Sequence, residues 1–185
     1  MSLKGYLITF FISMVPIVEL RGAIPIAESI GLNIFIYYPL AIIGNMIPVP
    51  FIYFFARKVL EWGKDKKMIG KFFTWCLEKG EKGGEKLKEK AGSTGTFWAL
   101  LLFVGIPVPG TGAWTGTLAA SLLNLGFKTS IIAVSLGVLL AGIIMSLGSK
   151  IVSTLGWLGL LIVIVLVVII ILISTIINKK NKEKV

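Results

Sequence analysis

Three long apolar stretches constrain this chain more than any other feature of its sequence. The longest covers residues 151–178 and contains no Asp, Glu, Lys or Arg. A helix rises about 1.5 Å per residue, so a helix of this length exceeds the roughly 30 Å hydrocarbon core of a bilayer. Residues 33–62 and 127–150 read as two further spans. We therefore expect an all-α integral membrane protein, with a last transmembrane helix near residues 155–177 and a basic tail at 179–185.

Two further segments, residues 3–32 and 94–124, are apolar at both ends but carry helix breakers at their centres. The first contains Pro16 and Pro25, and the second contains Gly-Ile-Pro-Val-Pro-Gly-Thr-Gly at 105–112. Each half is too short to cross the bilayer, so we expect each segment to be a re-entrant hairpin that turns at mid-depth. Irregular backbone at that depth must be buried in protein or line a wet cavity. Two such hairpins therefore predict a polar site inside the membrane.

The order of the segments predicts an internal repeat within a single membrane domain, residues 1–185. Residues 1–62 would form repeat 1, with hairpin 3–32 and a span at 33–62 that is kinked near its Pro48-Val49-Pro50. Residues 94–150 would form repeat 2, with hairpin 94–124 and span 127–150. Because the first span carries the chain across the membrane, the second hairpin would enter from the other side. The repeats would then be inverted, an arrangement found in many secondary transporters.

The two halves can also be aligned directly, although few residues are identical. A shift of about 91 residues pairs Val15-Pro16 with Ile106-Pro107, and Leu32-Asn33 with Leu123-Asn124. The order of elements is the stronger reason to expect a repeat.

The net charge of +10 lies mainly in two blocks, residues 57–90 and 179–184, each beside an apolar segment. The positive-inside rule places such blocks in the cytoplasm. We therefore expect a multi-pass protein of the cell membrane with its N-terminus outside and its basic linker, residues 63–93, and C-terminus inside. In the linker, residues 68–77 suggest a short amphipathic surface helix, and residues 78–90 a solvated connection. Nucleic acid is not an expected partner, because the charge is not spread over a face.

The chain has one cysteine, Cys76, and no histidine. An intramolecular disulfide is therefore impossible, and zinc sites or His-based triads have no support. No nucleophile–base or metal-ligand constellation is visible. We expect neither an enzyme nor a bound metal or cofactor.

Glu19 and Arg21 are the sharpest functional signal. Each charge at membrane depth is unfavourable by about 2.5–3.5 kcal/mol on insertion scales, so such residues persist when they are paired, wet or functional. At a hairpin tip both side chains could point into one cavity. Arg21 would then offer a fork of donors to a phosphate, carboxylate or sulfate, and Glu19 would hold Arg21, exchange a proton or attract a cation. The structural alternative is a salt bridge between the two that only staples the hairpin.

Other candidates are less sharply defined. Glu28 could join the cavity or lie at the outer interface, and Asn45 could offer its amide or simply sit at the kink of its span. Residues of the second hairpin could free backbone N–H groups that form an anion cradle beside the helix start near 113–117, or could only make a tight turn. The candidates in that hairpin are Pro107, Pro109, Gly110, Thr111, Gly112, Trp114 and Thr115.

Two strings carry a family resemblance: Val-Pro-Ile-Val-Glu-Leu-Arg-Gly-Ala-Ile-Pro at 15–25, and Gly-Ile-Pro-Val-Pro-Gly-Thr-Gly-Ala-Trp-Thr-Gly at 105–116. Together they resemble the small multidrug export protein family of prokaryotes, over nearly the whole chain. The layout is also similar to the DedA, or VTT-domain, superfamily. That similarity implies two opposed re-entrant hairpins and a role in moving lipids across bilayers, including the carrier undecaprenyl phosphate.

The superfamily resemblance implies an essential acidic residue in the first hairpin, which Glu19 or Glu28 would match. It also implies arginines in the second hairpin, and here the sequence departs, because residues 103–117 contain none. The one arginine at membrane depth is Arg21, which could replace them in space.

Three functions follow from these observations. The first is a transporter whose midplane cavity moves an anionic lipid, such as a polyprenyl phosphate, with Arg21 as its binding group. The second is a proton-coupled exporter of small cations or drugs that uses Glu19. The third is a membrane scaffold whose basic linker binds a partner. Membrane lipids are expected neighbours in each case, and we expect a homodimer because a chain this small often pairs to enclose a cavity.

Overall fold

The computed structural model describes residues 2–66, 70–108, 110–162 and 164–165. These residues form helices and connecting turns, with no strand among them, as the apolar pattern predicts. The helices are α1 (Ser2–Met14), α2 (Glu19–Ser29), α3 (Ile34–Met46), α4 (Pro48–Gly63), α5 (Gly70–Gly105), α6 (Ala113–Leu122) and α7 (Phe127–Leu155).

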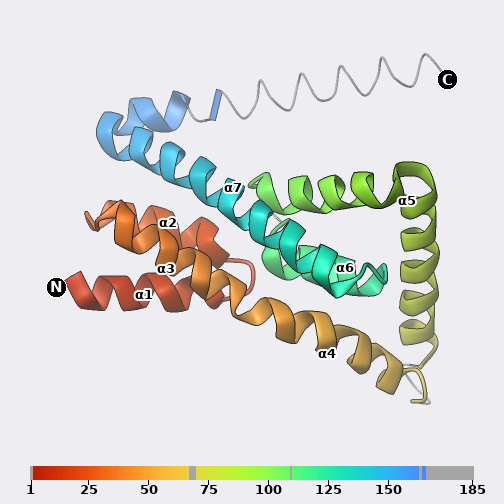
Figure 1. Cartoon of the computed structure of the whole chain (residues 1–185). Helices are drawn as coiled ribbons and strands as arrows, with labels where there is room; N and C mark the ends of the chain where they lie inside the picture. Colours follow the sequence, from red (N-terminus) through yellow and green to blue (C-terminus); the bar gives the residue numbers. More distant parts are fainter. Residues whose placement is uncertain (1, 67–69, 109, 163, 166–185) are drawn as a thin grey trace, which may run out of the picture.

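Helices α1 and α2 are antiparallel neighbours joined by a turn at residues 15–18 (Figure 1). The turn falls where it does because Pro16 disfavours helical backbone at the residue before it. With 13 and 11 residues, the two helices extend about 20 Å and 16 Å, which is less than the hydrocarbon thickness of a bilayer. Their tip therefore ends inside the molecule rather than at its far end.

A second pair of short helices approaches from the opposite end of the molecule (Figure 1). Helix α5 bends at Gly92, whose φ of 65° and ψ of −178° are not helical, and its second arm runs from there to Gly105. The chain turns through residues 106–112 and returns as α6. The tips of the two helical pairs meet near the middle of the structure (Figure 1). Their re-entrant placement in a bilayer and the inverted repeat remain predictions.

Helices α3 and α4 form one long rod. The Asn33 side chain caps the start of α3 by accepting a 2.9 Å hydrogen bond from the Phe35 N–H. Ile47, between the two helices, keeps helical backbone angles (φ −57°, ψ −45°), and Pro48 occupies the first turn of α4, where its missing N–H is not needed. The predicted kink near residues 45–50 is thus a helix boundary without a sharp break.

Within the described residues, two helical segments are long and apolar enough to cross a membrane: Ile34–Gly63, with 30 residues, and Phe127–Leu155, with 29. Helix α7 extends five residues beyond the predicted end of its span at 150, because no helix breaker occurs before Gly156, which has a φ of 55°. Residues 151–155 therefore belong to α7 and not to a separate final span. Half of the predicted final span at 151–178, and the basic tail at 179–185, lie outside the described residues.

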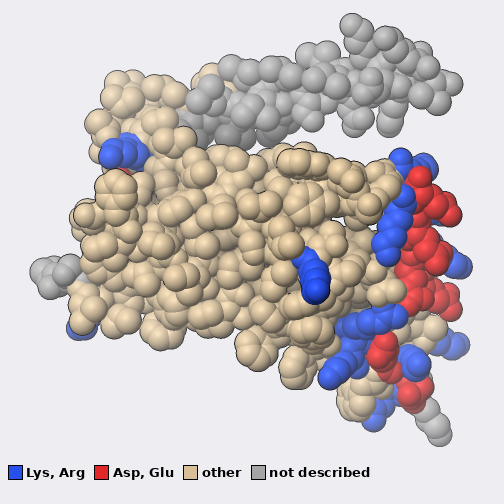
Figure 2. Space-filling model, in the orientation of Figure 1, with Lys and Arg blue, Asp and Glu red and all other residues tan. Residues whose placement is uncertain are grey.

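The first arm of α5 replaces the predicted solvated connection at 78–90. The stretch is helical although it contains Gly80, Gly83 and Gly84. The arm packs tightly on the end of α6, since a Cβ added to Gly84 would meet the Leu123 carbonyl oxygen. Lys88 Nζ also donates to the Asn124 carbonyl at 3.1 Å. The charged side chains of this arm gather at one end of the molecule (Figure 2).

The buried core lies where the short helices pass between the long ones, and includes Leu20, Ile24, Tyr37, Val104, Val134 and Val138. Large apolar side chains also cover much of the outside, among them Phe35, Phe51, Phe55 and Leu147. The long flanks in Figure 2 are almost free of charge. Such an extended apolar surface matches lipid and not water, so the chain is a membrane protein.

The helix boundaries refine the predicted shift between the two halves. The second arm of α5 ends at Gly105, 91 residues after the end of α1 at Met14, whereas α6 begins at Ala113, 94 residues after α2 begins at Glu19. The second tip is therefore three residues longer than the first. The proposed pairing of Val15 with Ile106 matches these boundaries. By the same boundaries Asn33, at the start of α3, would pair with Gly126, at the start of α7, two residues beyond the proposed Asn124.

Candidate functional site

The first tip brings two charged residues to the start of α2. The Glu19 N–H donates to the Val15 carbonyl at 2.9 Å, which closes the turn. Ile17 and Glu19 both have positive φ angles, 72° and 50°, a region that side chains other than Gly, Asn and Asp rarely adopt. The strained turn projects Glu19 away from its own helix pair, where its side chain is 4% exposed.

The second tip offers backbone groups in place of charges. Gly110 and Gly112 have φ angles of 84° and 148°, which suit glycine and allow the chain to reverse sharply. A Cβ on Gly112 would lie 2.8 Å from the Glu19 Cδ atom. Glycine at this position therefore lets the first tip approach the start of α6.

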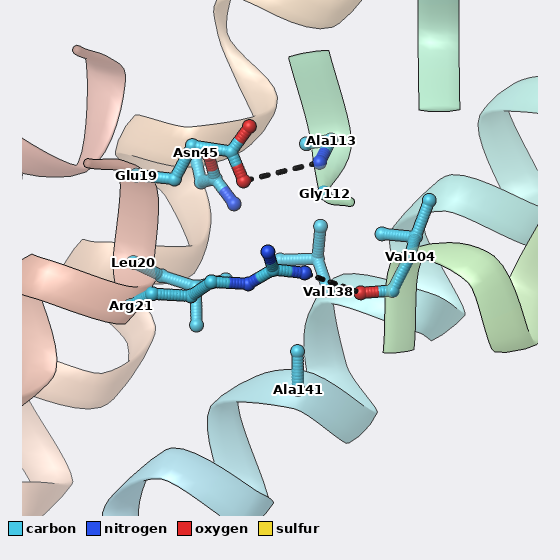
Figure 3. Close-up of a pocket in the computed structure, with 9 residues that line it drawn as sticks. All are labelled: Glu19, Leu20, Arg21, Asn45, Val104, Gly112, Ala113, Val138 and Ala141. Carbon is cyan, nitrogen blue, oxygen red and sulfur yellow. Dashed lines mark hydrogen bonds between the residues drawn. The ribbon is translucent and has the colours of Figure 1, made fainter. Parts of the chain in front are cut away.

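The carboxyl group of Glu19 binds the N-terminus of α6. Its Oε2 accepts a hydrogen bond from the Ala113 N–H at 3.2 Å (Figure 3). Its Oε1 accepts one from the Trp114 N–H at 3.0 Å. These N–H groups have no partner within the helix, and the helix dipole places partial positive charge at this end. A carboxyl group of the protein itself thus binds the helix start where the sequence predicts an anion cradle, and binding of any other anion there stays a prediction.

Arg21 binds the other side of the second tip, at the C-terminal end of α5 and in the turn that follows it. Its guanidinium donates to the carbonyls of Val108 at 2.6 Å, Ile106 at 3.3 Å and Val104 at 3.4 Å, and to the hydroxyl of Thr111 at 2.8 Å. A fifth hydrogen bond reaches the Thr111 carbonyl. Val104 lies in the last turn of α5, where the helix dipole is negative.

The predicted staple between Glu19 and Arg21 is wrong. In the described part of the chain, ion pairs within 4 Å join Arg57 to Glu61 and Glu81. The two charges of the first tip instead bind the second tip, the carboxyl at the start of α6 and the guanidinium at the end of α5. Hydrogen bonds to charged groups contribute about 1.5–3 kcal/mol each, so the tips are held together chiefly by these contacts.

A small pocket lies between the tips, and it is closed. Atoms fill it so tightly that a water-sized sphere does not fit. Asn45, from the last turn of α3, lines it and is 0% exposed, yet neither its Nδ2 nor its Oδ1 has a hydrogen-bond partner among the described residues. Figure 3 shows its side chain beside the Glu19 carboxyl group. Its role in binding stays a prediction.

The other predicted residues take different positions. Glu28 lies at the far end of α2, where Oε2 accepts from the Tyr37 hydroxyl at 2.7 Å and Oε1 from Ser153 at 3.3 Å, so it does not line the pocket. The Thr115 hydroxyl donates back to the Gly112 carbonyl at 3.4 Å. Pro107 and Gly110 shape the turn of the second tip, and Pro109 lies outside the described residues.

Five lining residues were not among the sequence candidates: Leu20, Val104, Ala113, Val138 and Ala141. They are apolar and carry no chemical signal of their own. Ala141 belongs to the small-residue run of α7 that allows close packing, and this is the one sequence feature that indicates its position. They make the pocket walls apolar, which strengthens the electrostatic contacts inside it.

The donors of this site suit an oxyanion, and the carbonyls around Arg21 suit a cation. Among the residues that the structure describes, no three His, Cys, Asp or Glu side chains cluster as metal ligands do. A comparison with family models gives a match to the family described as "Putative small multi-drug export protein", over residues 19–144. The matched segment begins at Glu19, directly after the first turn, and includes the whole second tip. Neither the curated proteins nor the solved structures give a match.

Proposed function

This chain belongs to the small multidrug export protein family, and on that premise we propose that it is a membrane transporter that moves an anionic lipid through a site between two re-entrant hairpins. The hairpins would be α1–α2 and the second arm of α5 with α6. The spans would be α3–α4 and α7 in inverted repeats, with the charged end of the molecule in the cytoplasm. A similarity in layout to the DedA superfamily is part of this proposal.

One observation carries the choice of an anion: the α6 N-terminus already binds a carboxyl group, with a guanidinium at the same tip. Helix N-termini and arginine forks recur in phosphate recognition. The lipid would be a phosphate monoester such as a polyprenyl phosphate, whose tail would remain in the bilayer. Binding would require the closed tips to separate, which fits a transporter that alternates between two states.

Reconstitution in liposomes tests this function. Flipping of a labelled polyprenyl phosphate would be compared between the wild type and Arg21→Ala, with Arg57→Ala as a control for the loss of one arginine far from the pocket. We expect flipping by the wild type and by Arg57→Ala, and its loss in Arg21→Ala. Absence of flipping by a folded, correctly inserted wild type would contradict the lipid substrate.

A second function is supported by a different observation, the ring of acceptors around Arg21. The carbonyls of Val104, Ile106, Val108 and Thr111 converge on one cationic group. A cationic drug could take the place of the guanidinium, with Glu19 exchanging a proton. This exporter would lose transport in Glu19→Gln but tolerate Arg21→Ala, whereas the lipid transporter would lose it in Arg21→Ala. Either form could act as a homodimer, which cross-linking in the membrane would test.

A further inference from the structure

Glu19 is held in its cradle by few contacts. Two backbone N–H groups bind its carboxyl oxygens, and its own backbone has a φ of 50°. Backbone in such a region is unfavourable by about 1–3 kcal/mol and persists only where its surroundings impose it. Release of the carboxyl group would relieve this strain. The Glu19 contact is therefore one that a competitor could replace.

The pocket also holds a donor that Glu19 leaves unused. Asn45 is fully buried, its amide faces the pocket, and its Nδ2 and Oδ1 have no partners. An unsatisfied buried polar group is unfavourable by about 1–3 kcal/mol, so an orphaned amide at a binding site indicates a missing partner. Each carboxylate oxygen could accept a second hydrogen bond, but among the described residues neither Glu19 oxygen is bonded to the Asn45 amide. A phosphate group offers further oxygens in three dimensions, which the Asn45 amide could reach.

We propose that the α6 N-terminus, Asn45 and Arg21 form a phosphate site, and that Glu19 is an internal competitor which occupies this site until a substrate displaces it. The two anions cannot share the cradle, because the pocket has no space for both and their charges repel. The nature of the substrate rests on the function proposed above, whereas the competition itself can be measured without transport. It would make the empty transporter close on itself and open when a phosphate arrives.

Two variants remove the competitor in different ways. Glu19→Gln removes the charge while keeping the size of the side chain. Gly112→Ala keeps the charge but places a Cβ against the Glu19 carboxyl group, with Cδ only 2.8 Å away. Glu61→Gln is the control for the loss of one negative charge. Glu61 is an exposed carboxylate near the C-terminal end of α4, where it pairs with Arg57. Because the first two variants perturb folding differently, a failure of one to fold leaves the other as a test.

The experiment is isothermal titration of full-length protein in detergent with geranyl phosphate, inorganic phosphate and geraniol. We expect Glu19→Gln and Gly112→Ala to bind geranyl phosphate at least about tenfold more tightly than the wild type and Glu61→Gln. Adding Asn45→Leu to Glu19→Gln should remove this gain. Equal tightening for inorganic phosphate would assign the site to free phosphate, and tightening for geranyl phosphate alone would assign it to a lipid headgroup.

Binding by Glu19→Gln and Gly112→Ala that is no tighter than that of the wild type would overturn the competition, as would equal tightening for geraniol, which lacks the phosphate. These results are independent of the liposome assay. If the wild type flips lipid but the two variants do not bind geranyl phosphate more tightly, the proposed function stands and the competition by Glu19 is wrong. If the variants bind more tightly but the wild type does not flip lipid, the competition stands and the proposed function is wrong.

Discussion

The two tips that meet inside this protein are built from opposite kinds of chemistry. The first is a turn of four residues with strained backbone at Ile17, and both charges, Glu19 and Arg21, follow it at the start of α2. The second has seven residues and carries no charged side chain, but it exposes the ends of two helices. Glu19 binds the N-terminal end of α6, where the helix dipole is positive, and Arg21 binds the C-terminal end of α5, where it is negative. The difference shows how a membrane protein can stabilise a buried acid and a buried base without pairing them with each other.

The largest effect on lipid flipping should come from Arg21→Lys. This variant tests whether the second tip needs the several donors of a guanidinium or only a positive charge. Lysine has three donors on a point charge and cannot reproduce five contacts spread over one loop. We expect lipid flipping to fall by at least about tenfold, the equivalent of one lost hydrogen bond to a charged group. Arg57→Lys should change little, because its ion pairs are exposed. Full activity in Arg21→Lys would show that the fork is unimportant.

The next effect concerns the space between the tips. Gly112→Ala and Gly110→Ala both place a side chain at positive φ, but a Cβ at Gly112 meets the Glu19 carboxyl group and one at Gly110 meets nothing within 4 Å. We expect Gly112→Ala to lower the free energy of unfolding by about 1–3 kcal/mol more than Gly110→Ala, because it adds a clash to the same kind of strain. Thermal unfolding in detergent measures this. Equal losses would mean that the tips do not touch at Gly112.

A smaller and opposite effect is expected from Asn45→Leu. Leucine has the same branched shape and removes two unpartnered polar atoms from the pocket. The protein should unfold at the same or a higher temperature, with up to about 1–3 kcal/mol gained, while lipid flipping falls. A variant that is both less stable and fully active would show that Asn45 serves the fold and not the substrate.

The smallest effect should follow Glu28→Gln. Glutamine can still accept the hydrogen bond from the Tyr37 hydroxyl, and Glu28 lies outside the pocket. We expect its flipping rate to stay within about a factor of two, less than 0.5 kcal/mol, against a much larger change for Glu19→Gln. The comparison decides which carboxylate corresponds to the acidic position of the DedA superfamily. A larger loss in Glu28→Gln than in Glu19→Gln would assign that position to Glu28.

Much of the fold could be predicted because its determinants are local. Long apolar runs gave the candidate spans, and the prolines and glycines of both tips placed the turns within a few residues. The first arm of α5 was predicted less well, because a charged, glycine-rich stretch resembles a flexible linker in sequence. The close approach of Gly84 to the α6–α7 connection, which explains that composition, depends on residues almost 40 positions away.

The sequence singled out the candidate residues of the site, but it did not predict which groups they bind. A buried charge signals function by its depth alone, so Glu19 and Arg21 could be singled out. Their partners are backbone groups of the second tip, and any sequence supplies such groups. The sequence left open whether the two charges serve a cavity or pair with each other, and in the structure they bind two different helix ends. The unpartnered amide of Asn45 likewise becomes visible only once its surroundings are known.

The contact between Glu19 and α6 is the centre of this arrangement, and NMR of the Ala113 and Trp114 amides in nanodiscs tests it most directly. Hydrogen bonds to a carboxyl group shift amide resonances, so spectra of the wild type and Glu19→Gln would be compared, with the Ala120 amide deeper in α6 as an internal control. Large shifts confined to Ala113 and Trp114 are the expected result. Unchanged resonances for these two amides in a folded Glu19→Gln variant would contradict the contact, and with it the division of charge and helix poles between the two tips.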